Sequence, residues 1–272
     1  MSRISQKSAV APLNLFSQAT SASTGTGYVD PANVTYVGQR FDLSDGREVQ
    51  LVSNAAVALV SGVLIQSPAI VAGHQTLAMT VPAATPATAG TNQILVTNGA
   101  TVINAGFYNG GYAIVKDGTG IGQTLNIQTH PGAAASGTCL ITLEDPIQVT
   151  LDATSIVNLI QNPSQNVIIS PTTATGNVVG VTLYPLAASV APTWNATSGA
   201  VATAGTQQYG LIATKGIVSC LSDSNTATVG LGVMRSTTTA GTVAVRTATG
   251  ADVGNALQTT ISAKAGAIFL DV

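Results

Sequence analysis

Charged residues are scarce in this sequence. Nine Lys and Arg and eleven Asp and Glu make up 7% of the 272 residues, against roughly a quarter in an average soluble domain. No charged residue lies between Glu48 and Lys116, or between Asp152 and Lys215. On such a surface hydroxyl and amide groups, rather than charged groups, must interact with water. A net charge of only −2 favours self-association. We interpret this composition as that of a chain built to form part of a larger assembly.

The sequence also lacks the features that nucleic-acid and membrane binding need. Lys and Arg are not clustered, whereas neutralising phosphates requires a basic patch. The uncharged segment Ala55–Ala72 has the length of a membrane helix. Gly62 and Ser67-Pro68 interrupt it, so we expect two strands joined by a turn. Neither a nucleic acid nor a membrane is expected as a partner.

Histidine and cysteine are too few to suggest a metal site. His74 and His130 are the only histidines, and Cys139 follows His130 by nine residues. A metal centre needs more nitrogen, sulfur or carboxylate ligands at suitable spacing. We therefore expect His130 to be part of a structural turn, and Cys139 and Cys220 to be reduced, half-buried thiols. No metal and no cofactor is predicted.

Two further patterns resemble functional motifs but are better explained as turns. The glycines of Gly118–Gly122 could hold a phosphate only if a helix followed them, and an alternating, strand-like segment follows instead. The oxygens of Asp117-Gly118 and Asp223-Ser224-Asn225 offer too few carboxylates for Ca²⁺. We predict a glycine-rich hairpin at the first site and Asx turns at the others.

Catalytic residues are not evident either. Glu144-Asp145 is the sole adjacent acidic pair, and it could supply half of a hydrolase dyad. Its place before Pro146 indicates a solvated turn, and only two histidines could serve as a general base. We expect no catalytic residue and no enzymatic activity. If the chain were a cell-wall or polysaccharide hydrolase, Glu144, Asp145 and His130 would be the residues to test.

Short Val, Ile, Leu and Thr runs alternate with turn clusters about every ten residues, which predicts an all-β fold of antiparallel sandwich or barrel modules. Only Thr154–Ile160 could form a helix. The expected strands are Arg47–Val52, Val57–Gln66, Gln93–Thr97, Tyr112–Lys116, Thr124–His130, Cys139–Leu143, Gln148–Leu151, Gly180–Leu183, Tyr209–Lys215, Ile217–Leu221, Thr228–Met234, Thr242–Thr247 and Ala267–Val272.

Composition divides the chain into three parts. Residues 1–36 are small and polar, and we expect an extended arm there. Its apolar run is broken by Pro12 and Asn14, so no secretory signal is predicted. Residues 37–175 would form a β-rich domain and residues 176–272 a C-terminal β-barrel domain. In the alternative arrangement residues 37–66 complete the barrel of the C-terminal block and the middle is an insertion.

Two blocks resemble head structural proteins of tailed bacteriophages. The segment Asn104–Pro146 begins with NAGFYNGGYAIVKDGTGIGQTLNIQTHP and continues to LITLEDP. The stretch from Gln207 resembles small capsid decoration, or cement, proteins, with Gly254-Asn255-Ala256-Leu257 followed by the apolar end Ile268–Val272. The resemblance covers about half of the chain, and it carries over no catalytic or ligand residue.

This resemblance implies a structural virion protein with a tulip-like C-terminal domain. Made in the host cytoplasm, it would bind the outside of the phage head and stabilise contacts between capsomers. Its partners would be the major capsid protein and further copies of itself, as a homotrimer or another homo-oligomer. The competing hypothesis is a receptor- or glycan-binding head fibre, tail spike or adhesin. In that case Trp194, Tyr184 and Tyr209 would stack on sugar rings.

Overall fold

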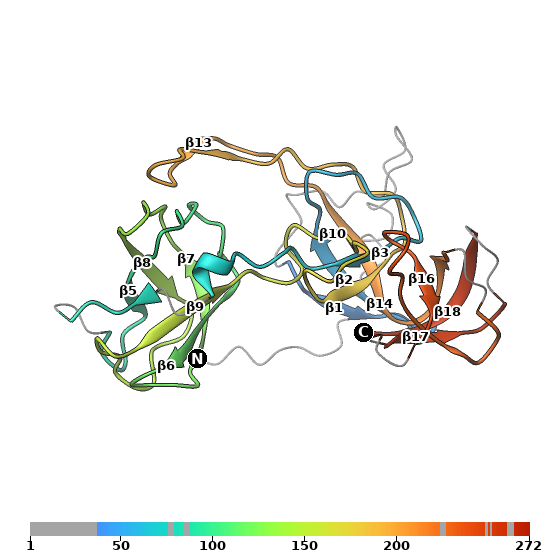
Figure 1. Ribbon diagram of the computed structural model, residues 1–272, viewed down its shortest axis with the longest axis horizontal. Coiled ribbons are helices and arrows are strands. Elements are labelled where there is room, and N and C mark those ends of the chain that lie inside the picture. Colours follow the sequence, from blue (N-terminus) through green and yellow to red (C-terminus); the bar gives the residue numbers. More distant parts are fainter. Residues whose placement is uncertain are drawn as a thin grey trace. The chain divides into compact units, whose positions relative to one another are not determined.

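The computed structural model describes residues 37–75, 79–83, 87–223, 227–247, 250, 252–259 and 264–272. Within them the fold is almost entirely antiparallel β (Figure 1), which confirms the predicted fold class. The one helical element in this part of the chain is the three-residue 3-10 turn η2, Ala72–His74. The arm expected over residues 1–36 lies outside the described residues.

Contacts divide the chain into two units whose limits differ from the expected boundary between residues 175 and 176. Unit 1 consists of Ala69–Asn162 and Pro192–Gly205. Unit 2, in its described part, consists of residues 37–68 together with Pro163–Ala191 and Thr206–Val272. The physical reason is strand pairing, because early strands complete the sheet of the C-terminal block while the middle of the chain closes on itself.

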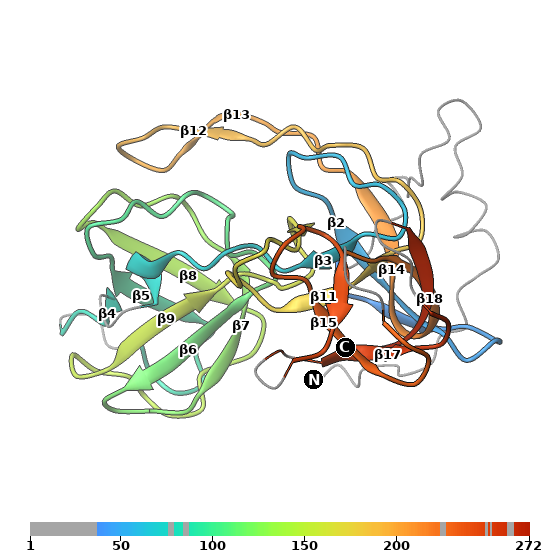
Figure 2. The same ribbon diagram turned by 45° about the vertical axis from the view of Figure 1, so that its right-hand side comes forward.

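Unit 1 is a closed six-stranded barrel in the order β4-β5-β8-β7-β6-β9, to which a separate hairpin of β12 and β13 belongs (Figure 2). Its strands are β4 (Met79–Thr80), β5 (Gln93–Thr97), β6 (Tyr112–Asp117), β7 (Thr124–Thr129), β8 (Thr138–Leu143), β9 (Ile156–Ile160), β12 (Thr193–Trp194) and β13 (Val201–Thr203).

The described residues of the barrel form one hydrophobic core. Each long strand alternates buried and exposed residues, as in β5, β6 and β7, because successive side chains of a strand point to opposite faces. The inward set is aliphatic apart from Tyr108, Met79 and Cys139. Because aromatic residues are scarce, valine, isoleucine and leucine fill most of the barrel interior.

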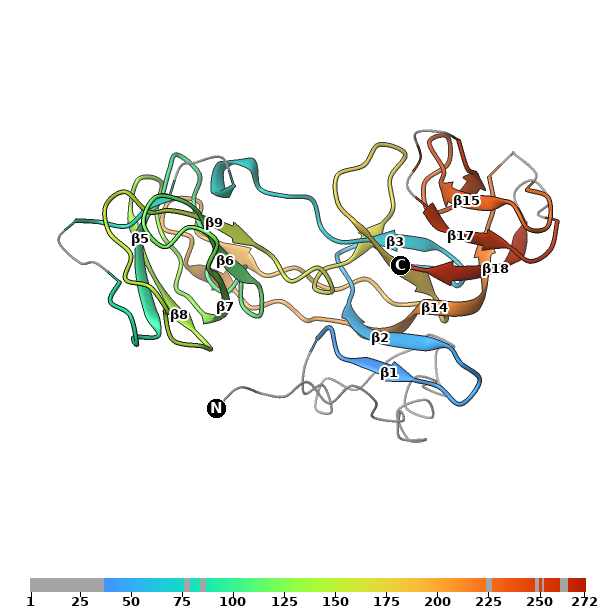
Figure 3. The same ribbon diagram turned by 90° about the horizontal axis from the view of Figure 1, so that it is seen from below.

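Unit 2 is a ten-stranded sheet that curls into a half-barrel (Figure 3). Its strands are β1 (Arg40–Asp42), β2 (Glu48–Ser53), β3 (Leu64–Gln66), β10 (Ile168–Ile169), β11 (Val178–Thr182), β14 (Tyr209–Leu221), β15 (Gly232–Arg235), β16 (Val243–Val245), β17 (Asp252–Ala256) and β18 (Ala265–Asp271).

The long strand β14 organises unit 2. Its first half pairs with β2 and β11, and its second half pairs with β18. The sequence predicted two strands separated at Gly216, but the strand is continuous from Tyr209 to Leu221. Gly216 has a φ of +94° beside a register shift between Ala213 and Lys215. A glycine in a bulge bends a strand without ending it.

Thr154–Ile160, the one stretch that could have supported a helix, is not helical: Ile156–Ile160 forms β9 between β4 and β6. Two predicted strands were wrong because side chains bind backbone groups that a sheet would otherwise use. Gln148–Leu151 is not a strand, because Gln123 Oε1 accepts hydrogen bonds from the N–H groups of Gln148 and Val149 at 2.9 and 3.0 Å. Of Val57–Gln66 only β3 is a strand, since Asn54 and Thr182 donate to the carbonyls of Val57 and Val60.

The turn at Asp117-Gly118 is confirmed. β6 and β7 pair as a hairpin, and Gly118 has a φ of +76°. A Cβ at this position would collide with the Thr154 carbonyl. The residues Gly118–Gly122 are therefore a hairpin connection between two strands, as predicted, and no helix follows them.

Candidate functional site

The two histidines of the chain lie together inside unit 1, on either side of Tyr108. His74 belongs to η2, His130 follows β7, and all three side chains are buried. The His74 and Tyr108 rings are 5.5 Å apart and the Tyr108 and His130 rings 5.8 Å apart. His74 and His130 are 56 residues apart along the chain, and only the closing of the barrel brings them together.

Hydrogen bonds fix the tautomer of each histidine. Nε2 of His130 accepts the backbone N–H of Tyr108 at 2.9 Å, and Nδ1 donates to the Pro131 carbonyl at 2.9 Å. In His74, Nε2 donates to the Thr101 carbonyl at 3.2 Å, and Nδ1 accepts the hydroxyl hydrogen of Tyr108 at 2.6 Å. Since a carbonyl only accepts and an N–H only donates, these partners make the His130 imidazole neutral with its hydrogen on Nδ1, and they place a hydrogen on Nε2 of His74.

Burial makes this cluster resistant to ionisation. It lowers the pKa of His74 and of His130 below the ordinary value of 6.5, and the charge of His74 lowers the pKa of His130 further. Burial also raises the pKa of the Tyr108 hydroxyl. Each ring nitrogen of the two histidines has a hydrogen-bond partner within the protein.

The remaining candidate ligands and catalytic groups do not join this cluster. Glu144 and Asp145 are exposed, whereas both ring nitrogens of His130 are bound by backbone groups. The Cys139 thiol is fully buried rather than half-buried, and it donates to the Pro131 carbonyl at 3.5 Å. Across the described residues, no three His, Cys, Asp or Glu side chains are grouped as metal ligands.

The residues proposed for sugar stacking belong to different units. Trp194 belongs to unit 1, while Tyr184 and Tyr209 belong to unit 2. The Trp194 indole N–H donates to the Ala105 carbonyl at 3.3 Å, and its ring packs edge-on against Phe107 at 6.3 Å. Trp194 is therefore used to hold the β12–β13 hairpin within its own unit.

Sequence reasoning did not find the outward face of β14 and β18 in unit 2. Ile217 and Phe269 stand directly opposite each other in the ladder, with 59% and 39% of their surfaces exposed. Ser219 pairs with Ala267 beside them. The charges on this stretch of ladder are Lys215 and Asp271, which pair with each other at 3.6 Å. The alternation of apolar and small residues along 217–221 and 265–269 was the signal that could have revealed it.

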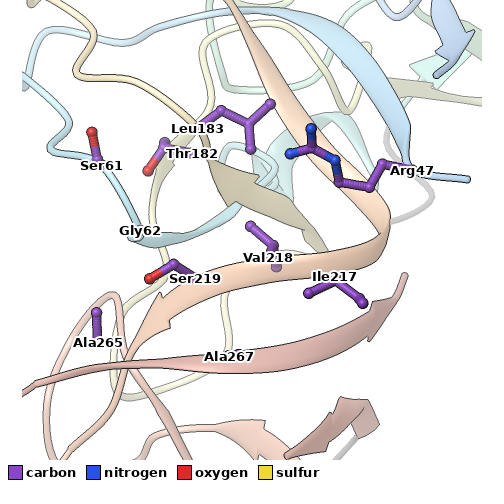
Figure 4. A pocket seen from close by; sticks show the side chains of 10 residues that line it. All are labelled: Arg47, Ser61, Gly62, Thr182, Leu183, Ile217, Val218, Ser219, Ala265 and Ala267. Carbon is purple, nitrogen blue, oxygen red and sulfur yellow. The ribbon is translucent and has the colours of Figure 1, made fainter. Parts of the chain in front are cut away.

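A hollow of about 410 Å³ borders this face (Figure 4). Ile217, Ser219 and Ala267 line it together with Gly62 and Leu183, and the only charged lining group is Arg47. The Arg47 guanidinium is held by Asp45 at 2.7 Å. Such a lining suits an uncharged, apolar contact better than it suits catalysis, because the hydroxyls of Ser61, Thr182 and Ser219 are its only candidate nucleophiles and it presents no acid or base beside them.

Comparisons with protein-family models, with curated proteins and with solved structures found no match. Along the described chain, no helix is long and apolar enough to cross a membrane.

Proposed function

We propose that this chain is a structural protein of a tailed-bacteriophage head, a decoration or cement protein that binds the outside of the capsid. Its partners would be the major capsid protein and further copies of itself. The observation that carries this proposal is the outward β14–β18 face, on which Ile217 and Phe269 are exposed side by side. Exposed apolar side chains grouped on one face are typical of interaction surfaces.

Charge supports the same proposal. The described ion pairs number four and are all in unit 2, and each has at least one partner on the exposed surface. Exposed ion pairs contribute little to stability, so contacts made by this chain would depend on hydroxyl, amide and apolar groups. Such contacts are only weakly sensitive to salt, which suits a protein that must hold capsomers together under varied ionic conditions.

The sequence resemblance supplies the identity of the partner. The first part of the phage-like segment Asn104–Pro146, up to Pro131, forms β6, its glycine turn, β7 and the His130 corner. The decoration-like end Ile268–Val272 contains most of β18. β18 is also the strand that carries Phe269. The glycan-binding alternative is less favoured, because the Trp194 ring and N–H are engaged within unit 1.

The decisive experiment is binding to expanded heads assembled from the major capsid protein encoded in the same genome. We expect the chain to co-sediment with the heads and to saturate a fixed number of sites. Replacing Ile217 and Phe269 by Ser should weaken binding at least about tenfold, equivalent to about 1.4 kcal/mol. Leu140→Ser is the matched control, since Leu140 is exposed on β8 of unit 1.

Salt and self-association complete the test. Binding should change little between low and high salt, and sedimentation velocity of the free protein should show oligomers. A protein that stays monomeric and never binds the heads would overturn the proposal. Equal weakening by Leu140→Ser would exclude the β14–β18 face as the contact.

A further inference from the structure

The β12–β13 hairpin is held in unit 1 by a few backbone and ring contacts. The Ala105 N–H donates to the Gly199 carbonyl at 2.8 Å, and the Trp194 N–H donates to the Ala105 carbonyl at 3.3 Å. Gly199 also approaches the Ile103 carbonyl and Gly132 so closely that a Cβ at either glycine would collide. The hairpin turn therefore rests on two segments, residues 103–107 and residues 131–132.

His130 ties these two segments together. Its carbonyl accepts the Gly106 N–H at 3.2 Å, and its Nε2 accepts the Tyr108 N–H at 2.9 Å. Its Nδ1 donates to Pro131, next to Gly132. Phe107, which packs on Trp194, lies between the two bonded residues. One imidazole thus orients both surfaces on which the hairpin lies.

We propose that His130 is an acid-sensitive latch: proton uptake at its Nε2 breaks the hydrogen bond from the Tyr108 N–H and releases the 192–205 hairpin from the barrel. A protonated Nε2 is a donor, and it would face the Tyr108 N–H, which is also a donor. Two buried donors without acceptors are costly. Either the ring or the 104–108 segment must move, and both hold the hairpin.

The surroundings of His130 offer no compensation for a positive charge. The titratable groups packed near it are Tyr108, His74 in η2 and Cys139 in β8, whose thiol shares the Pro131 carbonyl. The charged residues of the described part of unit 1 are Lys116, Asp117, Glu144, Asp145 and Asp152. None of these five makes a hydrogen bond or ion pair to either imidazole, because both rings are fully bonded to Tyr108 and backbone carbonyls.

His74 differs from His130 in a way that provides a control. Its Nδ1 partner is a hydroxyl, which can rotate and accept a hydrogen bond from a protonated Nδ1 instead of donating one. Protonating His74 therefore breaks no hydrogen bond. Its positive charge would instead oppose the charging of His130.

The sign of the pH effect follows from burial. Both histidines have a pKa below 6.5 in the docked state, so the state in which the hairpin is released and His130 is solvated binds protons first as the pH falls. The docked state is fully stable above pH 6.5, loses stability below it, and reaches a lower plateau under the folded pKa. Within this window the equilibrium constant for release of the hairpin should rise by about tenfold for each pH unit of acidification, if one proton is taken up.

The experiment follows the emission of Trp194, the only tryptophan, in the full chain between pH 8 and pH 4.5. We expect a shift to longer wavelength with a midpoint below 6.5, while far-ultraviolet circular dichroism stays constant. His130→Gln keeps an acceptor oxygen without a titrating group and should abolish the shift. His74→Gln should keep the shift and move its midpoint to higher pH.

Nuclear magnetic resonance keeps the proposal testable if His130→Gln does not fold. At neutral pH the wild-type protein should show an Nδ1–H tautomer at His130 and an Nε2–H tautomer at His74. Exchange of the Tyr108 amide, corrected for its intrinsic rate, should accelerate below pH 6.5. Any of three results would overturn the latch. His130 could prove to be the Nε2–H tautomer, the corrected exchange rate of the Tyr108 amide could be independent of pH, or the shift of Trp194 emission could persist in His130→Gln.

Discussion

Both cysteine side chains lie in hydrophobic cores, Cys139 in the barrel of unit 1 and Cys220 in the sheet of unit 2. Burial raises the pKa of Cys139 to about 11 and that of Cys220 to about 12. Thiol chemistry requires the thiolate. The two thiol groups therefore serve as small apolar packing groups in the cores.

We predict that neither thiol reacts in the native protein. At pH 8 about one Cys139 in a thousand is ionised, given a pKa of about 11, and both side chains are covered. Titration with a coloured disulfide reagent should show slow reaction until denaturant is added, and then two equivalents per chain. Fast reaction of one equivalent under native conditions would contradict the burial of that cysteine.

The connection between β6 and β7 shows how an element depends on a glycine for two separate reasons. Gly118 and Gly122 both have positive φ, +76° and +90°, which disfavours any other residue by about 1–2 kcal/mol. Only Gly118 also lies against a neighbouring backbone, at Thr154, whereas nothing lies within 4 Å of a Cβ at Gly122. The two positions separate backbone strain from steric contact.

Gly118→Ala should destabilise unit 1 more than Gly122→Ala. The second change costs the strain alone, about 1–2 kcal/mol, while the first must also displace the Thr154 carbonyl next to β9. Urea unfolding followed by Trp194 emission measures both. Equal losses of unfolding free energy in the two variants would mean that residues 152–155 move aside at little cost and do not hold the hairpin connection in place.

At the scale of the molecule, the hydrophobic cores are separate. The barrel core contains residues of unit 1 alone, and the three remaining clusters contain residues of unit 2 alone. Two units with independent cores need not unfold in one step. Each unit carries one buried cysteine, which gives each its own probe.

Leu270→Ala should destabilise unit 2 alone. Leu270 is fully buried in β18, and truncating a buried leucine costs about 2–5 kcal/mol. Cys220 should therefore become reactive at lower urea concentration while the transition of Cys139 stays unchanged. Leu257→Ala is the control, since Leu257 is exposed and its loss should cost less than about 0.5 kcal/mol. If Leu270→Ala shifted the urea transitions of both cysteines equally, the two units would unfold as one cooperative molecule.

The sequence by itself determined the fold class, most strands of the barrel and the turn at Asp117-Gly118. These depend on neighbours along the chain, because alternation and turn residues act locally. The sequence missed the side chains that replace strand ladders, such as Gln123 and Thr182, since their backbone partners are 25 or more residues away.

Tertiary structure alone decided which segments share a unit and what the histidines do. Strand β2 joins β14 across more than 150 residues, and the 192–205 hairpin returns to a barrel whose last strand ended at Ile160. The meeting of His74, Tyr108 and His130 has the same origin. Local patterns specify which residues become strands, but pairing between distant strands is chosen by the burial of whole faces, which no short stretch of sequence contains.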